Sequence, residues 1–296
     1  MAEKVISTIV TEIKYAKYFS ISVDSTPDIS HADHLSFIVR YVSAEGCPVE
    51  RFIRFIPNCD HKAEDLANVV LDTLKNHDLD IANCRGQSYD NASNIAGVYS
   101  GLQARIKQVN PLVVFVPCSA HSLNLVGSCA AKCCEAAISF FGTLQELYNF
   151  FSVSTNRWEV LLSQLKPNST VVKSLSQTRW SAQGDACRGL CCSWNESMAA
   201  LQIIASDTSE KPSTSSKASG LFNSIDSLEM CFLALLWNDI LERSNKVSKS
   251  LQSVNIELGT IAELYWSLVT YLEDIRKVGT FDHFESKAVE TSGEQN

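Results

Sequence analysis

The chain has 296 residues, of which 45% are hydrophobic, enough for one large globular domain or two smaller ones. Its 25 basic and 33 acidic side chains give a net charge of −8, which argues against nucleic-acid binding through a general basic surface. There is no apolar signal-peptide core after Met1, no apolar run of membrane-spanning length and no C-x-x-C motif. We therefore expect an intracellular protein, nuclear or cytoplasmic, with reduced cysteines and no membrane segment.

The first 116 residues predict a mixed sheet with helices on its faces. A helix is expected over residues 1–17, and the alternation of Phe19, Ile21 and Val23 predicts a half-buried strand that delivers Asp24 at its end. A second aspartate, Asp90, ends another predicted short strand. The remaining expected elements are a hairpin over 34–42 and 49–56, a helix over 63–75, a helix over 98–108, and a central strand over 112–116 that is buried on both faces.

The rest of the chain reads as helical. Helices are predicted after Cys118, and then over 138–151, 158–165, 181–204, 221–240 and 261–275. Residues 206–220 are polar and of low complexity, which predicts a loop, and no further core element is expected after Lys277. Segment 221–296 holds twelve acidic and six basic side chains, so we expect any DNA path to avoid it.

Asp24 and Asp90, each at a strand end, are candidate ligands for Mg²⁺ or Mn²⁺, because hard divalent cations take carboxylate oxygens. Aspartates at strand ends are also common turn residues, and the pattern by itself favours two turn caps. Arg179 and Trp180 offer a guanidinium for a phosphate and a ring for base stacking, although the pair also suits ordinary packing.

Cys118 and His121 are separated like half of a zinc site, with Cys129 and Cys133 further along the predicted helix. These offsets spread the four groups over several helical turns, which is too extended for one tetrahedral cage, so a buried cysteine and a hydrogen-bonded histidine are favoured. A thiolate–imidazole nucleophile lacks an identifiable oxyanion motif or orienting acid. No phosphate-binding glycine loop or G-x-S-x-G motif is present.

Four short motifs in one order make the chain resemble the hAT superfamily of DNA transposases, in the domesticated branch related to zinc finger MYM-type proteins. The resemblance spans roughly residues 15–277, and the ordered set is more specific than any one member. The motifs are Ser22-Val23-Asp24-Ser25-Thr26, Tyr89-Asp90-Asn91-Ala92-Ser93-Asn94, Cys118-Ser-Ala-His121-Ser-Leu-Asn-Leu and Thr178-Arg179-Trp180.

The resemblance implies a ribonuclease H-like core, interrupted by an all-helical insertion, in which two aspartates and a glutamate bind divalent metal for DNA cleavage and joining. Asp24 and Asp90 match the first and second acidic positions. Positions beside the active site that contact or orient DNA are matched by Cys118, His121, Arg179 and Trp180.

The chain departs from this pattern because it stops within the helical insertion, before the expected glutamate helix. We therefore expect a ribonuclease H-like core over 1–180 and a partial helical insertion over 181–296, in a transposon-derived protein inactive in DNA cleavage and joining. The alternatives are a residual divalent-metal-dependent nuclease and a protein-binding scaffold. The net charge predicts at most weak DNA contact, a protein partner or full-length relative is open, and the oligomeric state is not predicted.

Overall fold

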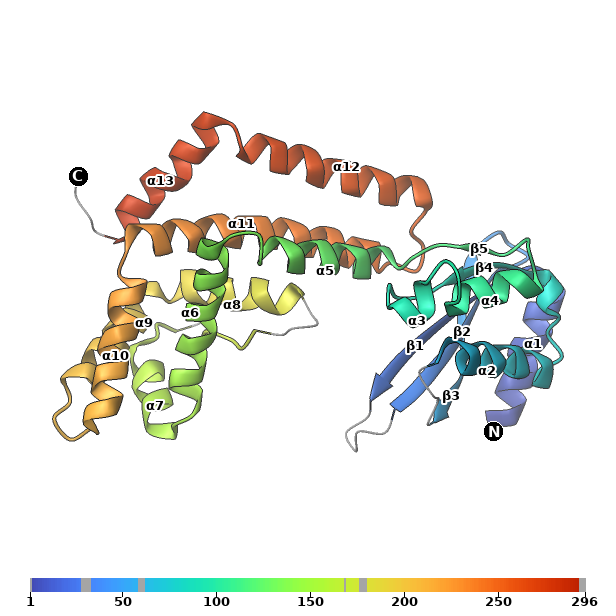
Figure 1. Cartoon of the computed structure of the whole chain (residues 1–296), viewed down its shortest axis with the longest axis horizontal. Helices are drawn as coiled ribbons and strands as arrows, with labels where there is room; N and C mark the ends of the chain where they lie inside the picture. The colour runs from blue at the N-terminus through green and yellow to red at the C-terminus, as the bar shows by residue number, and fades with distance from the viewer. Residues whose placement is uncertain (1, 28–32, 58–61, 168, 176–179, 293–296) are drawn as a thin grey trace. The chain divides into compact units, whose positions relative to one another are not determined.

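The computed structural model describes residues 2–27, 33–57, 62–167, 169–175 and 180–292, and its chain forms two compact units (Figure 1). Unit 1 comprises Met1–Ser122 with Gln252–Ile256, and unit 2 comprises Leu123–Leu251 with Glu257–Asn296. Each unit has its own hydrophobic core, so each is described separately.

Unit 1 is a five-stranded mixed sheet in the order β3-β2-β1-β4-β5. The first three strands are antiparallel neighbours, whereas β4 runs parallel to β1 and β5 runs parallel to β4. This arrangement confirms the expected mixed α/β fold with helices on the sheet. Its elements are α1 (Ala2–Ala16), β1 (Phe19–Pro27), β2 (Asp33–Val42), β3 (Pro48–Pro57), α2 (Ala63–Asn76), a 3₁₀ turn (Ile81–Asn83), β4 (Cys84–Ser88), α3 (Ser93–Ala96), α4 (Leu102–Val109) and β5 (Val114–Phe115).

The core of unit 1 follows from period-two alternation. Phe19, Ile21 and Val23 on β1 are all buried, as predicted, and they continue a layer with alternate residues of β2. Burying one such side chain contributes about 1.5–3 kcal/mol, so a one-residue slip of β1 would forfeit most of this layer. The remaining fully buried side chains in the layer include Leu35, Phe37, Val39, Ile13, Val70 and Leu74.

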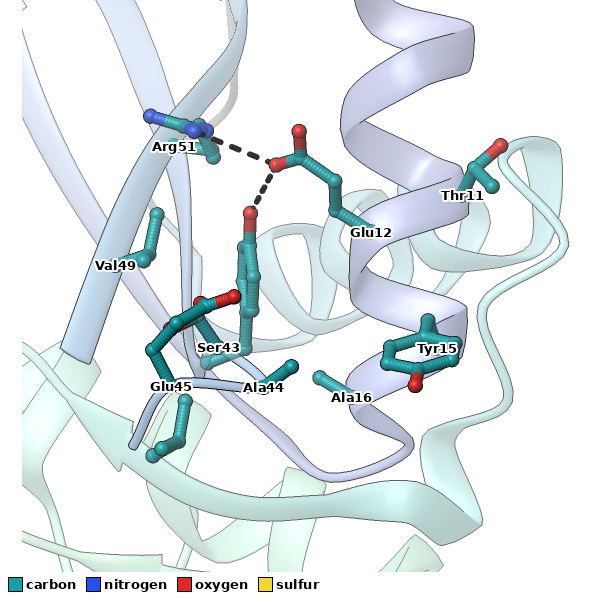
Figure 2. Close-up of a pocket in the computed structure, with 11 residues that line it drawn as sticks. Thr11, Glu12, Tyr15, Ala16, Ser43, Ala44, Glu45, Val49 and Arg51 are labelled. Atoms are coloured by element: carbon teal, nitrogen blue, oxygen red, sulfur yellow. Dashed lines mark hydrogen bonds and ion pairs between the residues drawn. The ribbon is translucent and has the colours of Figure 1, made fainter. Parts of the chain in front are cut away.

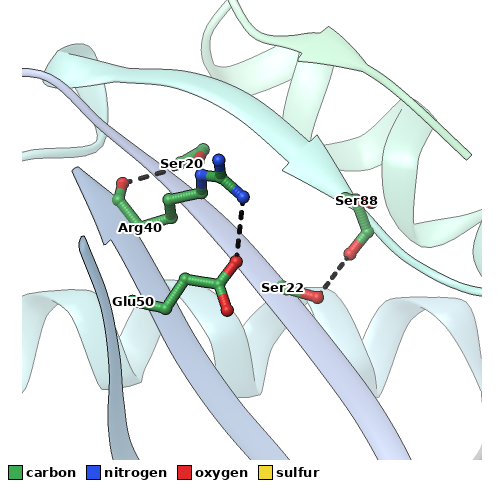
Figure 3. Close-up of polar contacts among 5 residues, drawn as sticks. All are labelled: Ser20, Ser22, Arg40, Glu50 and Ser88. Carbon is green, nitrogen blue, oxygen red and sulfur yellow. Dashed lines mark hydrogen bonds and ion pairs between the residues drawn. The ribbon is translucent and has the colours of Figure 1, made fainter. Parts of the chain in front are cut away.

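Polar contacts tie neighbouring strands together on the other side of the sheet (Figure 3). The Ser20 hydroxyl donates to the Arg40 carbonyl oxygen at 3.4 Å, and the Arg40 guanidinium pairs with Glu50 at 3.0 Å. A Cβ added to Gly86, which is paired with Ser20, would lie 3.0 Å from the Ser20 Cβ. Glycine at 86 therefore lets β4 approach β1 closely.

The regular elements of unit 2 are all helices in the part of it that the structure describes. Its core is rich in aromatic residues, with Phe140, Phe150 and Phe151 almost completely buried and the Phe141 ring edge-on to Trp237 at 5.1 Å. Among the described residues no single helix is both long and apolar enough to cross a membrane, although two bent helix pairs meet that test together. The helices are α5 (Ser119–Ala130), which starts in unit 1, α6 (Glu135–Ser152), α7 (Thr155–Gln164), α8 (Trp180–Cys192), α9 (Trp194–Ser206), α10 (Pro212–Ile225), α11 (Leu228–Leu251), α12 (Leu258–Ile275) and α13 (Val278–Ser292).

The strand predicted over 112–116 is not central. Only Val114 and Phe115 are paired, and they form the edge strand β5 beside β4. Val113 is buried, but Leu112 and Val114 are exposed. The apolar run therefore does not mean burial on both faces. The predicted helix over 98–108 is also shorter, because it begins at Leu102 after the separate turn of α3.

The loop predicted over 206–220 is wrong for most of its length, because α10 begins at Pro212. Proline suits the first turn of a helix, and Ala218 packs fully buried against the core of unit 2. The end of the chain is likewise not without a core element, since α13 buries Phe284 and Ala288. The long helices predicted over 181–204 and 221–240 are each interrupted, at Ser193 and near Asp226.

The compact units divide after Ser122, not at the boundary predicted at residue 180. Helices α6 and α7 share one core with α8–α11, because Phe140, Leu144 and Leu161 cluster with Leu190 and Leu201. The apolar faces of α6 and α7 thus join them to the helices that follow. The sequence motifs do not reveal this packing.

Candidate functional site

The two predicted metal-ligating aspartates lie at matching positions along adjacent parallel strands of unit 1. Asp90 follows β4 by two residues, but Asp24 does not end its strand as predicted, because β1 continues to Pro27. Ser22 of β1 is paired with Ser88 of β4, and each aspartate comes two residues later, so both chains reach an aspartate at the same end of the sheet. The Ser22 hydroxyl donates to the Ser88 carbonyl oxygen at 2.9 Å and fixes this register (Figure 3). Alternation along a strand also places Asp24 on the face of Ser22.

The two carboxyl groups are close enough for the charge of Asp90 to affect Asp24. The pKa of Asp24 is raised, first because surrounding protein displaces part of its hydration and second because the negative charge of Asp90 repels its own. Asp24 nevertheless keeps exposed surface, so water and solutes reach it. Pairs of acidic side chains whose negative charges repel each other are typical of sites that hold a cation.

Three further groups affect the pKa of Asp24. A hydrogen bond from the Ser25 backbone amide and the charge of His121 both act to lower its pKa, whereas the charge of Asp33 acts to raise it. Asp33 itself accepts hydrogen bonds from the Ser25 hydroxyl at 2.6 Å. The structure thus brings the predicted residue His121 within electrostatic range of the acidic pair.

The loop that carries Asp90 is held by local hydrogen bonds. The Asp90 carboxylate accepts from the Ala92 backbone amide at 3.1 Å, the pattern of an Asx turn. The preceding residue, Tyr89, is buried and stacks against Phe115 with ring centroids 6.1 Å apart. Its carbonyl oxygen accepts from the Cys118 backbone amide at 2.9 Å. The residue before Asp90 is therefore anchored in the core, and the residues after it form a turn.

A second bridge joins this loop to the start of α5. The Asn91 side-chain amide donates to the Ser122 hydroxyl at 2.9 Å, and that hydroxyl donates to the Cys118 carbonyl oxygen at 3.0 Å. Cys118 is a free, half-buried thiol, and His121 lies one turn along α5. The backbone amide and carbonyl of Cys118 therefore link the Asp90 loop to the start of α5.

Sequence reasoning did not single out Asn91 and Ser122, although both lie inside the quoted motifs. Asp33 lies outside every motif, and only the β1–β2 pairing brings it close. No group of three or more His, Cys, Asp or Glu side chains suited to a metal occurs within the described ranges.

The side chains of Arg179 and Trp180, the predicted DNA-contacting pair, lie outside the described part of the chain. Arg179 lies outside the described residues, and Trp180 begins α8 of unit 2 with its side chain also outside them. Their role at the site stays a prediction.

A cavity of unit 1, with a volume of about 550 Å³, lies between α1 and the β2–β3 hairpin (Figure 2). At its wall the Tyr41 hydroxyl donates to the Glu12 carboxylate, which also pairs with Arg51 at 3.3 Å. Burial and the neighbouring Glu12 charge raise the pKa of Tyr41. These contacts fasten α1 to the sheet, and neither Asp24 nor Asp90 lines the cavity.

Comparison with known proteins matches residues 1–101 to the family model described as "DUF4371: ZMYM1/FAM200, RNase-like domain". The chain is 24% identical over 279 residues to the "52 kDa repressor of the inhibitor of the protein kinase" of Homo sapiens, covering 89% of this chain and 36% of that protein. It is 26% identical over 183 residues to the Mus musculus protein of the same name, covering 59% of this chain and 24% of that protein. The chain thus spans about a third of the human relative's length.

The match to an RNase-like domain agrees with the five-stranded sheet of unit 1 and supports the ribonuclease H-like fold. It covers Asp24 and Asp90, the register that joins them and the whole of β1–β4. The acidic pair therefore lies in the part of the chain where the family match and the observed sheet agree on the fold.

Proposed function

We propose that this chain derives from a hAT-type transposase and that unit 1 keeps the acidic pair of its ancestral metal site. We further propose that this chain does not itself cleave and join DNA. The proposal rests on the β1–β4 register, which brings both aspartates to the same end of the sheet, and on the charge of Asp90, which raises the pKa of Asp24. The RNase-like family match and the two relatives add support.

The donor set fits Mg²⁺ or Mn²⁺. Two carboxylates whose charges repel each other are relieved by a shared divalent cation, and both groups offer the hard oxygen ligands that these ions take. Asp24 and Asp90 would hold the ion, which when bound would neutralise phosphate charge and polarise a bound water. The other residues have simpler tasks. Ser22 fixes the strand register, and the Asn91–Ser122 bridge holds the Asp90 loop.

The proposed inactivity in strand cleavage rests on the number of metal ligands. The resemblance implies three carboxylates, and within the described parts of the chain no third His, Cys, Asp or Glu joins this pair in a metal-binding group. Losing a supporting group of a metal site typically weakens metal binding about 10- to 100-fold, and losing a direct ligand costs at least as much. We therefore propose weak metal binding without strand transfer.

Four residues other than the acidic pair are proposed to contact or orient DNA. His121 is within electrostatic range of Asp24, which suits a group that neutralises phosphate beside the metal. Cys118 orients the start of α5 through its backbone contacts. Arg179 and Trp180 are proposed on the motif alone, as a phosphate-binding fork and a stacking ring.

A cleavage assay tests this proposal. The whole chain is incubated with supercoiled plasmid and with a radiolabelled duplex, in Mg²⁺ and in Mn²⁺, beside the Asp24→Ala/Asp90→Ala double variant. We expect both proteins to leave the DNA intact to the same extent. Metal-dependent nicking by the wild type that the double variant lacks would instead establish the residual nuclease and overturn the proposed inactivity.

A further inference from the structure

Helix α12 of unit 2 is bound to the rest of its unit by few contacts. Of its 18 residues only Leu268 and Ile275 are buried. On the same side the Tyr271 hydroxyl donates to Asp239 of α11 at 2.5 Å, and Arg243 of α11 donates to the Ser267 hydroxyl at 2.6 Å. These contacts define the inner face of α12, toward α11.

The opposite face of α12 is apolar and exposed. Trp266 is 73% exposed and Val269 is 42% exposed, although both residue types normally lie inside a folded unit. The exposed apolar side chains follow steps of four, four, three and three residues, the spacing of one helix face. We name this face the outer stripe, and its residues are Leu258, Ala262, Trp266, Val269 and Leu272.

Acidic side chains border the outer stripe. Glu263 and Glu273 are exposed on α12, and no lysine or arginine occurs between Val254 and Ile275. The first basic residues, Arg276 and Lys277, follow the helix, where Lys277 pairs with Asp274 at 2.5 Å. The stripe is therefore an apolar surface with a negative border.

We propose that the outer stripe binds an amphipathic helix of another protein whose apolar face is flanked by lysine or arginine. An 18-residue helix is about 27 Å long, so the stripe offers one helix width over about five turns. That shape matches helix-on-helix recognition through residues at i, i+3, i+4 and i+7. Trp266 is the central anchor, since tryptophan is enriched among the few residues that dominate the binding energy of an interface.

Charge selects this occupant over a second copy of the chain. Pairing two outer stripes would set Glu263 and Glu273 of one copy against the same residues of the other, without a basic group in either helix. A basic border on the partner instead gives opposite charges along both edges. This surface lies in unit 2, and its role does not depend on the acidic pair of unit 1.

Fluorescence anisotropy with synthetic peptides tests the proposal on the whole chain. The probe is a fluorescein-labelled 18-residue helix of leucine and lysine, with leucine at i, i+3, i+4 and i+7. Its controls are a leucine–glutamate peptide of the same pattern and a scrambled leucine–lysine peptide. We expect the first peptide alone to bind. Trp266→Ser should weaken it at least about 10-fold, whereas Val153→Ser, a highly exposed residue elsewhere in unit 2, should leave it unchanged.

A charge reversal gives a second arm. Glu273→Lys should weaken the leucine–lysine peptide and strengthen the leucine–glutamate peptide, because specificity set by charge inverts with the sign. Hydrogen exchange of α12 should slow on binding, since few contacts hold this helix without the peptide. Circular dichroism of each variant checks that its helices are intact.

Three results would overturn the proposal. One is binding that Trp266→Ser leaves intact, which would place the peptide elsewhere. Another is a dimer in analytical ultracentrifugation that Trp266→Ser dissociates, which would make the outer stripe an interface between two copies of this chain. The third is equal binding of the basic and acidic peptides, which would remove the charge selection.

Discussion

Replacing Asp24 by asparagine should stabilise the metal-free chain at neutral pH. The pKa of Asp24 is raised in the folded state by lost hydration and by the charge of Asp90, so ionising it costs free energy that the unfolded chain does not incur. The favourable contribution of protonated Asp24 is fully present below the ordinary aspartate pKa of about 3.9 and is lost as pH rises through the raised value. Asparagine keeps the size of the side chain without the charge.

The magnitude is bounded by linkage. One proton changes the free energy of unfolding by at most about 1.4 kcal/mol per pH unit. Because Asp24 keeps exposed surface, solvent screening reduces the total, and we expect Asp24→Asn to gain less than about 1 kcal/mol at pH 7. The gain should vanish near pH 3, where the wild-type carboxyl is protonated in both states.

Urea unfolding of both proteins at half-unit steps from pH 3 to pH 7.5, with chelator present, measures this difference. Asp72→Asn, on the exposed side of α2, is the matched control and should show no comparable gain above pH 4. An Asp24→Asn protein that is less stable than wild type at pH 7 without metal would refute the reasoning, because the carboxylate would then be a net stabilising group.

Two other substitutions test neighbouring parts of the account. Ser122→Ala should cost about 1 kcal/mol in urea unfolding, because the Asn91 amide loses its acceptor and the Cys118 carbonyl loses a donor; a cost no larger than that of Ser128→Ala, on the same helix, would contradict the bridge. Ala218→Asp should destabilise unit 2 by at least about 2 kcal/mol, since it buries a carboxylate, whereas Ser216→Asp on the exposed side of α10 should be nearly neutral. Equal effects at 216 and 218 would favour the solvated loop over α10.

The strands of unit 1 were predictable because their signal is local. Phe19, Ile21 and Val23 alternate with polar residues, and that period alone determines which face is buried. Helix α10 was missed because its many serines resemble a linker, while its burial depends on Ala218, Leu221 and Ile225 meeting helices distant in sequence. Composition does not report such long-range packing.

The acidic pair was likewise predictable only where the signal is local. The sequence associates Asp24 and Asp90 with two strands, but their adjacency depends on β4 entering the sheet beside β1 after a helix crossover. The central placement expected for 112–116 failed for a related reason, since β4 is its only neighbour in the sheet. Which strand pairs with which is decided by the whole fold and not by a local run of apolar residues.

Isothermal titration of the chelated whole chain with Mn²⁺ tests the central claim most directly, with Asp24→Asn, Asp90→Asn and Asp72→Asn beside the wild type. We predict that the wild type and Asp72→Asn bind the ion alike, and that either site substitution weakens binding at least about 10-fold. Equal Mn²⁺ affinity in all four proteins, or its absence from the wild type, would contradict an acidic pair that still holds a divalent cation.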